Sequence, residues 1–165
     1  MLEYIYNLAQ TLPPELAVVL LSITPITEIR LSIPFAMQVY GFTPYQAMFW
    51  SVLGDIIPAA LLVYYLGPVS RFLMKRSSMA RRFFAWLFSK TRQKFPEDYS
   101  NLGKIVLMLF VALPFPGFGA WSGAIAAWLF DVKKTEALIF ILLGIILAAL
   151  AVTGLSLGIF SIFKF

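Results

Sequence analysis

Three ionisable residues lie inside otherwise apolar stretches of this sequence, and they are the first candidates for chemistry. Glu28 and Arg30 interrupt an apolar segment that runs from about 16 to 40, and Asp55 lies near the middle of another, 45–67. Inside a bilayer such residues are costly and are by default functional hypotheses. A desolvated carboxyl group can bind and release a proton, and a guanidinium can hold an anionic group such as a phosphate.

Each of these residues also has a structural interpretation. Glu28 and Arg30 would form a salt bridge that holds a break together, although positions i and i+2 point apart on a regular helix unless the backbone is unwound. Asp55 would pair with Arg30 across the bundle. It lies one turn before Pro58, which removes a helical hydrogen bond and favours a kink beside the acid. The sequence leaves both interpretations open.

The second candidate site is a helix break in the apolar segment 105–130. The residues that break the helix there are Pro114, Pro116, Gly117 and Gly119. Broken backbone at membrane depth survives only where it is buried in protein or lines a water-filled cavity. The N–H groups that begin the following helix could hold an anion. The alternative is a tight tip that lets two hairpins approach closely.

The composition indicates the class of protein. Of the 165 residues, 61% are hydrophobic and 13% are charged, which is unlike a soluble domain. We therefore predict one integral membrane domain over residues 1–165. The absence of Cys and His excludes disulfides, Cys/His zinc sites and Ser-His or Cys-His catalytic pairs. We predict no enzyme activity, no cofactor and no metal site.

The apolar segments form two similar halves, about 14–68 and 105–163. Each half has a broken segment, a short link and one uninterrupted span, and Gly54 and Gly144 follow the first proline of each break by 29 and 30 residues. Each limb of a break has roughly 10 residues, about half the hydrocarbon thickness. We therefore predict an all-α fold with two inverted re-entrant helical hairpins, whose tips meet near the midplane, and two transmembrane helices.

Between the halves lies a basic linker, residues 69–104, with nine of the thirteen basic residues. Its apolar residues recur at helical spacing, which predicts a basic amphipathic helix on the cytoplasmic leaflet that ends at Pro96. The alternative is a charged loop that only sets topology. We expect no nucleic acid as partner. We expect contacts with anionic membrane lipids through Arg71, Lys75 and Arg82.

Charge also favours re-entry over crossing. If the segment 105–130 re-enters, Lys133 and Lys134 lie on the same cytoplasmic side as the linker 69–104, as the positive-inside rule expects. The chain is then a multi-pass protein of the inner (cytoplasmic) membrane, with residues 69–104 in the cytoplasm.

Paired motifs near the two breaks give the chain a family resemblance. They are Thr24-Pro25 with Glu28-Ile29-Arg30-Leu31 and Ile33-Pro34, and Leu113 to Gly123 with the later Leu143-Gly144. With these motifs, roughly residues 14–155 resemble the family named putative small multidrug export proteins. The chain is more remotely similar to DedA-type membrane proteins, which share paired re-entrant hairpins and are linked to lipid-carrier translocation and proton-dependent drug resistance. The resemblance implies a transporter.

The residues and the resemblance together predict a small secondary transporter or lipid translocase that exports drugs or moves an anionic lipid. In the predicted mechanism Glu28 and Asp55 exchange protons, and Arg30 meets an anionic group during alternating access around the hairpin tips. A homodimer is expected, because a second copy would shield the broken segments. The alternative is a non-transporting membrane-organising or lipid-binding protein whose intramembrane charges are structural.

Overall fold

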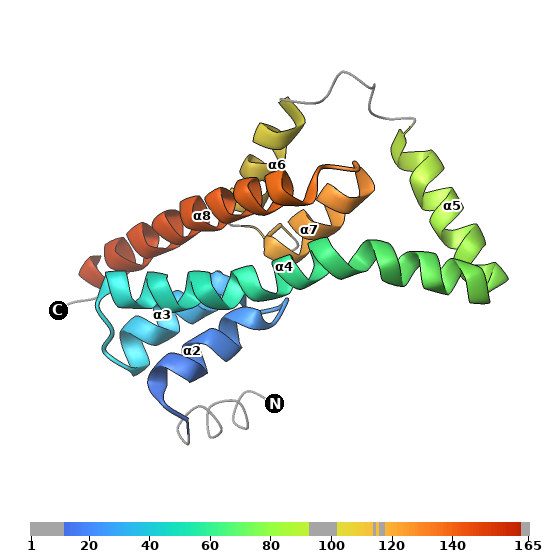
Figure 1. Ribbon diagram of the computed structural model, residues 1–165. Coiled ribbons are helices and arrows are strands. Elements are labelled where there is room, and N and C mark those ends of the chain that lie inside the picture. The colour runs from blue at the N-terminus through green and yellow to red at the C-terminus, as the bar shows by residue number, and fades with distance from the viewer. Residues whose placement is uncertain (1–11, 93–101, 114, 116–117, 163–165) are drawn as a thin grey trace.

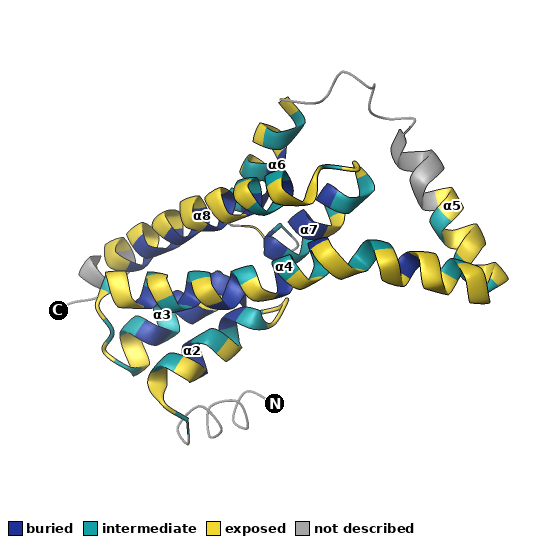
Figure 2. Ribbon diagram, in the orientation of Figure 1, coloured by how far each residue is buried: buried dark blue, intermediate teal, exposed yellow. Residues whose placement is uncertain are grey.

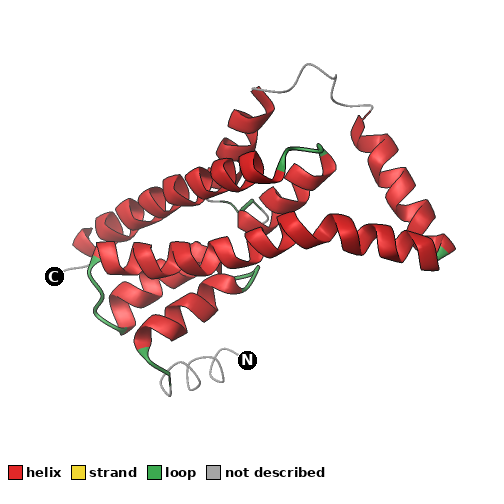
Figure 3. Ribbon diagram, viewed as in Figure 1, coloured by secondary structure: helices red, strands yellow, loops and turns green. Residues whose placement is uncertain are grey.

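The computed structural model describes residues 12–92, 102–113, 115 and 118–162, and every regular element in this part of the chain is a helix (Figure 1, Figure 3). Two pairs of short helices are joined by breaks: α2 (Pro14–Ile23) with α3 (Glu28–Val39), and α6 (Leu102–Ala112) with α7 (Ala120–Leu129). The remaining helices are α4 (Pro44–Arg76), α5 (Ser78–Arg92) and α8 (Lys134–Ile162). The predicted all-α class is therefore confirmed for these residues.

Local sequence explains the turns of the first half. Thr24 has an extended backbone, as the residue before a proline usually does, and α2 ends there. Gly41 has a φ of 65°, which a glycine adopts without steric cost. At the start of α4, the Thr43 hydroxyl accepts from the Gln46 N–H and the Gln46 side chain accepts from the Thr43 N–H. This capping box fixes the beginning of the first long helix.

Helices α4 and α8 are both long and apolar enough to cross a membrane. They contain 33 and 29 residues, and at 1.5 Å per residue each exceeds a hydrocarbon layer of about 30 Å. Their buried residues face the rest of the bundle (Figure 2). The outer face of α8 exposes large apolar side chains, among them Leu143, Ile146, Leu147 and Leu150. Lipid tails, rather than water, suit a surface of this kind.

Each long helix packs closely against the first short helix of its own half. A Cβ atom on Gly54 of α4 would lie 2.6 Å from the Val19 carbonyl oxygen of α2. A Cβ atom on Gly144 of α8 would lie 2.6 Å from the Met108 carbonyl oxygen of α6. The two glycines therefore let backbones approach, as small residues do between membrane helices. Helices α4 and α8 also contact each other and α7, which joins the two halves.

The basic linker differs from its prediction as one surface helix. Helix α4 continues through Pro68 to Arg76, and the chain then breaks at Ser77 before α5 begins. The break has a local cause, because the Ser77 hydroxyl accepts a hydrogen bond from the Ala80 N–H at 3.3 Å, as an N-capping serine does. Residues 69–76 therefore extend the first long helix.

The other end of the linker also belongs to the bundle. Lys104 lies on α6 and forms an ion pair with Glu136 of α8, with 2.8 Å between Nζ and Oε2. Pro96, the predicted end of the surface helix, lies outside the described residues. The three predicted lipid contacts are thus divided between two helices: Arg71 and Lys75 lie on α4 and Arg82 lies on α5.

Candidate functional site

The two breaks contact each other through polar groups, of which the Glu28 carboxylate is buried and the Arg30 guanidinium is partly buried. Arg30, in the first turn of α3, forms an ion pair with Glu28. Its Nη2 donates a hydrogen bond of 2.8 Å to the carbonyl oxygen of Leu113, which directly follows α6. From α7, the Trp121 indole Nε1 donates to the carbonyl oxygen of Ile23, the last residue of α2, at 3.0 Å. We call Glu28, Arg30, Leu113 and Trp121 the tip contact.

Glu28 has a backbone conformation that permits its ion pair. It begins α3 with a φ of 42°, in the left-handed region that non-glycine residues rarely adopt. This departure from helical geometry allows Glu28 to reach Arg30 two residues later, which a regular helix does not allow. The Glu28 carboxylate also accepts a hydrogen bond from the backbone N–H of Trp121. Strained backbone held by contacts from another element is typical of functional sites.

The anion expected at the start of α7 is thus the carboxylate of Glu28. The N–H of Gly119 donates to the Ser122 hydroxyl at 2.9 Å, while the N–H of Trp121, in the first turn of α7, donates to Glu28. A Cβ atom on Gly119 would overlap both carboxylate oxygens of Glu28. Gly119 therefore permits the close approach of the two breaks, and the helix start stabilises the negative charge.

A second buried polar cluster surrounds Asp55. The Asp55 carboxyl accepts from the Ser22 hydroxyl at 3.3 Å and from the backbone N–H of Ile29. Ser22 also donates to the Ser51 carbonyl oxygen at 2.7 Å, and Ser32 donates to the Ser51 hydroxyl at 2.8 Å. All four side chains are almost fully buried, and they come from α2, α3 and α4. We call Ser22, Ser32, Ser51 and Asp55 the serine–aspartate cluster.

The structure pairs Arg30 with Glu28, so the alternative pairing of Asp55 with Arg30 is wrong. Pro58 does not end the helix beside Asp55, because α4 continues through it. Asp55 is 1% exposed and has no ion pair in the described residues. Because an unpaired buried charge is costly, a proton or a cation must accompany this carboxyl group. Ile29, which donates to Asp55, adjoins Glu28, so the serine–aspartate cluster borders the tip contact.

Some predicted site residues lie outside the described part of the chain, and some site residues were not predicted. Pro114, Pro116 and Gly117 fall outside the described residues. Sequence reasoning missed the three serines of the cluster, although isolated hydroxyls in apolar runs were a usable signal. The donation from Trp121 to Ile23 was not predicted either.

An apolar pocket of about 330 Å³ lies beside the tip contact. It is lined by Ile23, Trp121 and one face of α4, including Ile57, Pro58, Leu61 and Tyr65. Its volume is within the range of small-ligand sites, which are largely apolar with few polar groups. The site therefore combines buried charges with an adjoining space that suits an apolar molecule.

A protein-family model described as "Putative small multi-drug export protein" matches residues 28–151. The chain belongs to this family. The match begins at Glu28 and extends into α8, so it includes Arg30, Asp55 and the contacts made by α7. Family membership and the two long apolar helices agree in making this export-family protein a membrane protein. No curated protein and no solved structure matches the chain.

Proposed function

We propose that this protein is a small secondary transporter or lipid translocase whose substrate passes beside the tip contact. The observation that carries the proposal is that two helix breaks, far apart in sequence, meet through hydrogen bonds that Arg30 and Trp121 donate to backbone carbonyl oxygens of the opposite break, beside the partly buried Glu28–Arg30 ion pair. Secondary transporters place substrate and coupling ions at discontinuous helices near the bilayer midplane. The membership in an export family agrees with this class of function.

In this proposal the short helix pairs are re-entrant hairpins. Helices α2, α3, α6 and α7 have 10 to 12 residues each, or about 15–18 Å, which is half the hydrocarbon thickness. The first hairpin enters from one membrane face and the second from the opposite face, so the halves are inverted repeats. The corresponding packing of Gly54 and Gly144 supports a repeat. Paired hairpins of this kind are what the remote similarity of the sequence to DedA-type proteins implies.

Protonation of Glu28 would open the tip contact. A neutral Glu28 no longer holds the Arg30 guanidinium, and it accepts the Trp121 N–H bond less strongly, because charge-assisted hydrogen bonds are the stronger ones. Arg30 then becomes available for an anionic group on the substrate. The apolar part of a drug or lipid would occupy the pocket beside Trp121. An amphiphile with an anionic head fits both features.

Asp55 provides a second place for the coupling ion. Its carboxyl group lies within a shell of hydroxyls and has no cation partner in the described residues. A proton taken up there would neutralise the serine–aspartate cluster, while a sodium ion would find only oxygen ligands, which hard cations prefer. We propose the proton as the coupling ion. Transport measured under a pH gradient alone and under a sodium gradient alone distinguishes proton coupling from sodium coupling.

A second candidate is a non-transporting membrane-organising or lipid-binding protein. It is favoured by the Glu28 carboxylate being satisfied within the protein, since it accepts from Arg30 and Trp121 without a ligand. In that case the charges only stabilise the fold. Removal of one partner would then lower stability and change no flux.

We further propose a multi-pass protein of the inner membrane that acts as a homodimer. The breaks expose apolar residues, with Ile26 87% and Phe115 60% exposed. A second copy over this face would cover the broken backbone, which membranes tolerate only within protein or beside water. Disulfide cross-linking through Ile26→Cys tests this arrangement, because the native chain has no cysteine.

The deciding experiment compares wild type with Glu28→Gln in liposomes. Transbilayer movement of a fluorescent polyprenyl phosphate or phospholipid analogue is followed with and without a pH gradient. The matched control is Glu136→Gln, which breaks the Lys104 ion pair away from the breaks. We expect gradient-dependent movement in wild type and control, and its loss in Glu28→Gln. Lipid movement that changes neither with the pH gradient nor with the Glu28 substitution would refute proton coupling. If no folded variant moves the lipid, the result favours the non-transporting protein.

A further inference from the structure

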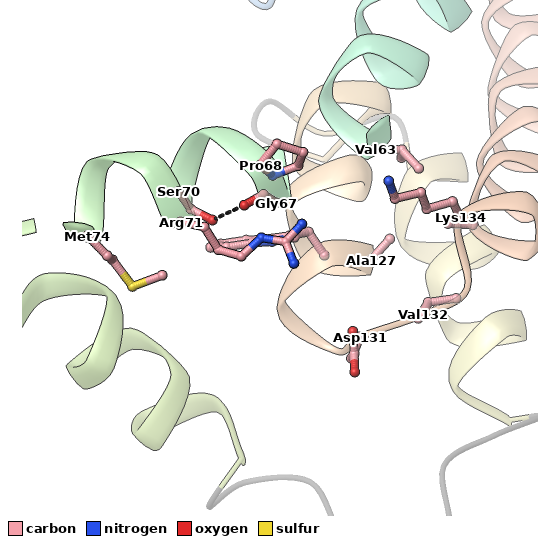
Figure 4. Close-up of a pocket in the computed structure, with 12 residues that line it drawn as sticks. Val63, Gly67, Pro68, Ser70, Arg71, Met74, Ala127, Asp131, Val132 and Lys134 are labelled. Carbon is pink, nitrogen blue, oxygen red and sulfur yellow. Dashed lines mark hydrogen bonds between the residues drawn. The ribbon is translucent and has the colours of Figure 1, made fainter. Parts of the chain in front are cut away.

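A basic pocket lies at the far end of α4, away from the tip contact (Figure 4). It has a volume of about 320 Å³ and is formed by α4, the end of α7, the turn after it and the start of α8. The Trp128 indole packs beside Gly67, and its Nε1 would lie 3.6 Å from a Cβ atom built on that glycine. The pocket therefore joins segments from both halves of the chain.

Two cations enter this pocket from opposite sides. Figure 4 shows the Arg71 guanidinium from α4 and the Lys134 side chain from the start of α8 pointing toward one another. Lys134 Nζ donates to the Tyr64 carbonyl oxygen at 3.3 Å, which leaves two of its three N–H donors. Arg71 has no hydrogen-bond or ion-pair partner within the described residues. Most of the donors of this pair are therefore available to a ligand.

The remaining lining fits a lipid better than a free ion. Val63, Pro68 and Met74 give the pocket apolar walls, and Asp131 is the acidic residue of its lining. Two cations and one carboxylate leave a net positive charge, which favours an anion. The neighbouring charged residues at this end of the bundle, Lys104, Lys133 and Glu136, lie on α6 and at the start of α8. Such charges belong at the level of lipid headgroups, where long apolar helices leave the hydrocarbon.

We infer that the basic pocket binds the phosphate group of an anionic phospholipid, with Arg71 as the bidentate donor and Lys134 as the second cation. Arginine donates a planar fork that matches two phosphate oxygens, and lysine adds a point charge. Basic pockets between membrane helices on the cytoplasmic side recognise headgroups in this way. The site is separate from the tip contact and does not depend on transport.

Native mass spectrometry of the purified protein tests this inference by the affinity of one-to-one lipid adducts. Wild type is titrated with phosphatidylglycerol, with phosphatidylcholine and with soluble glycerol phosphate. The pocket variant is Arg71→Gln with Lys134→Gln. The control variant is Arg76→Gln with Lys133→Gln, which removes the same charge close to the pocket without changing a residue of its lining. Both variants change exposed residues, so both are expected to fold.

We expect wild type and the control variant to prefer phosphatidylglycerol over phosphatidylcholine by about tenfold, because the choline cation of phosphatidylcholine offsets its phosphate charge and is repelled by the two cations of the pocket. The pocket variant lacks both cations and should lose that preference. An Arg71→Lys variant should lose part of it, because the fork is gone but the charge remains. Equal losses in the pocket and control variants would overturn the inference in favour of unspecific surface charge. Competition by glycerol phosphate as strong as by lipid would make a free phosphate the ligand.

Discussion

At the scale of single residues, groups from each break have hydrogen-bond partners in the other break. Glu28 has a left-handed backbone conformation and meets the Trp121 N–H, while Arg30 reaches the Leu113 carbonyl oxygen. Neither contact is local in sequence. A substitution at one break should therefore weaken the contacts of the other break and lower the stability of the protein. Substitution of Gly119 tests this most directly.

Gly119→Ala should destabilise the protein by about 1–3 kcal/mol, because the added Cβ overlaps the Glu28 carboxylate and separates it from the Trp121 N–H. The matched control is Gly154→Ala on α8, where a Cβ meets nothing within 4 Å. That control should gain about 0.5–1 kcal/mol from helix propensity. Thermal unfolding in detergent measures both, and equal shifts would contradict the close approach at Gly119.

Asp55→Asn should leave the melting temperature unchanged or higher, since the amide keeps an acceptor for Ser22 and no longer buries an ionisable group. Asp55→Leu should instead cost about 1–3 kcal/mol, because the Ile29 N–H loses its acceptor on Asp55 and the Ser22 hydroxyl keeps only the Ser51 carbonyl oxygen. Both variants should lose any response to a pH gradient in the liposome assay. A response that persists in Asp55→Asn would remove Asp55 from the coupling mechanism.

At the scale of helices, the two halves share packing but differ in chemistry. Ser51 and Asp55 lie three residues before and one residue after Gly54, and Ile141 and Ile145 occupy the same places around Gly144. All four side chains are buried. Corresponding buried positions are thus polar in the first half and apolar in the second. The first half provides the ionisable groups, and the second provides a packed scaffold and the backbone partners of the tip contact.

Gly54→Ala and Gly144→Ala should each destabilise the protein by about 1–3 kcal/mol, because the new methyl group meets a carbonyl oxygen of the neighbouring helix, which cannot rotate away. Gly67→Ala is the control, since its Cβ would lie 3.6 Å from Trp128 in ordinary contact. The measurement is the melting temperature of the three variants. A tolerated Gly144→Ala would argue against equivalent helix packing in the two halves.

At the scale of the whole molecule, the proposed topology makes a prediction about sides. Tyr45, Met79 and Thr135 are all exposed, and the chain has no cysteine, so single-cysteine variants report accessibility directly. If both hairpins re-enter, Met79→Cys and Thr135→Cys should react with an impermeant maleimide from the cytoplasmic side. Tyr45→Cys should react from the opposite side. Reaction of Tyr45→Cys and Thr135→Cys from one side would refute re-entry of the second hairpin.

The sequence by itself determined the membrane class, the all-helical fold and the positions of both breaks. These follow from local properties, because apolar composition sets the solvent, and Pro25 and the run of prolines and glycines from 114 to 119 disfavour a continuous helix at those two places. It also made Glu28, Arg30, Asp55 and Gly119 candidate site residues, since charge and glycine are conspicuous in apolar segments. The end of α4 at Ser77 was missed, because a serine cap competes only weakly with helix continuation.

Only the tertiary structure decided which group meets which. The sequence allowed Arg30 to pair with Glu28 or with Asp55, and the structure selects Glu28. The serine–aspartate cluster appears only when α2, α3 and α4 pack together. The basic pocket appears only when Lys134 is brought to Arg71. These outcomes depend on distances between residues far apart in the chain, and composition and spacing do not contain them. The sequence gives the chemical groups, and the packing of the helices determines which of these groups contact each other.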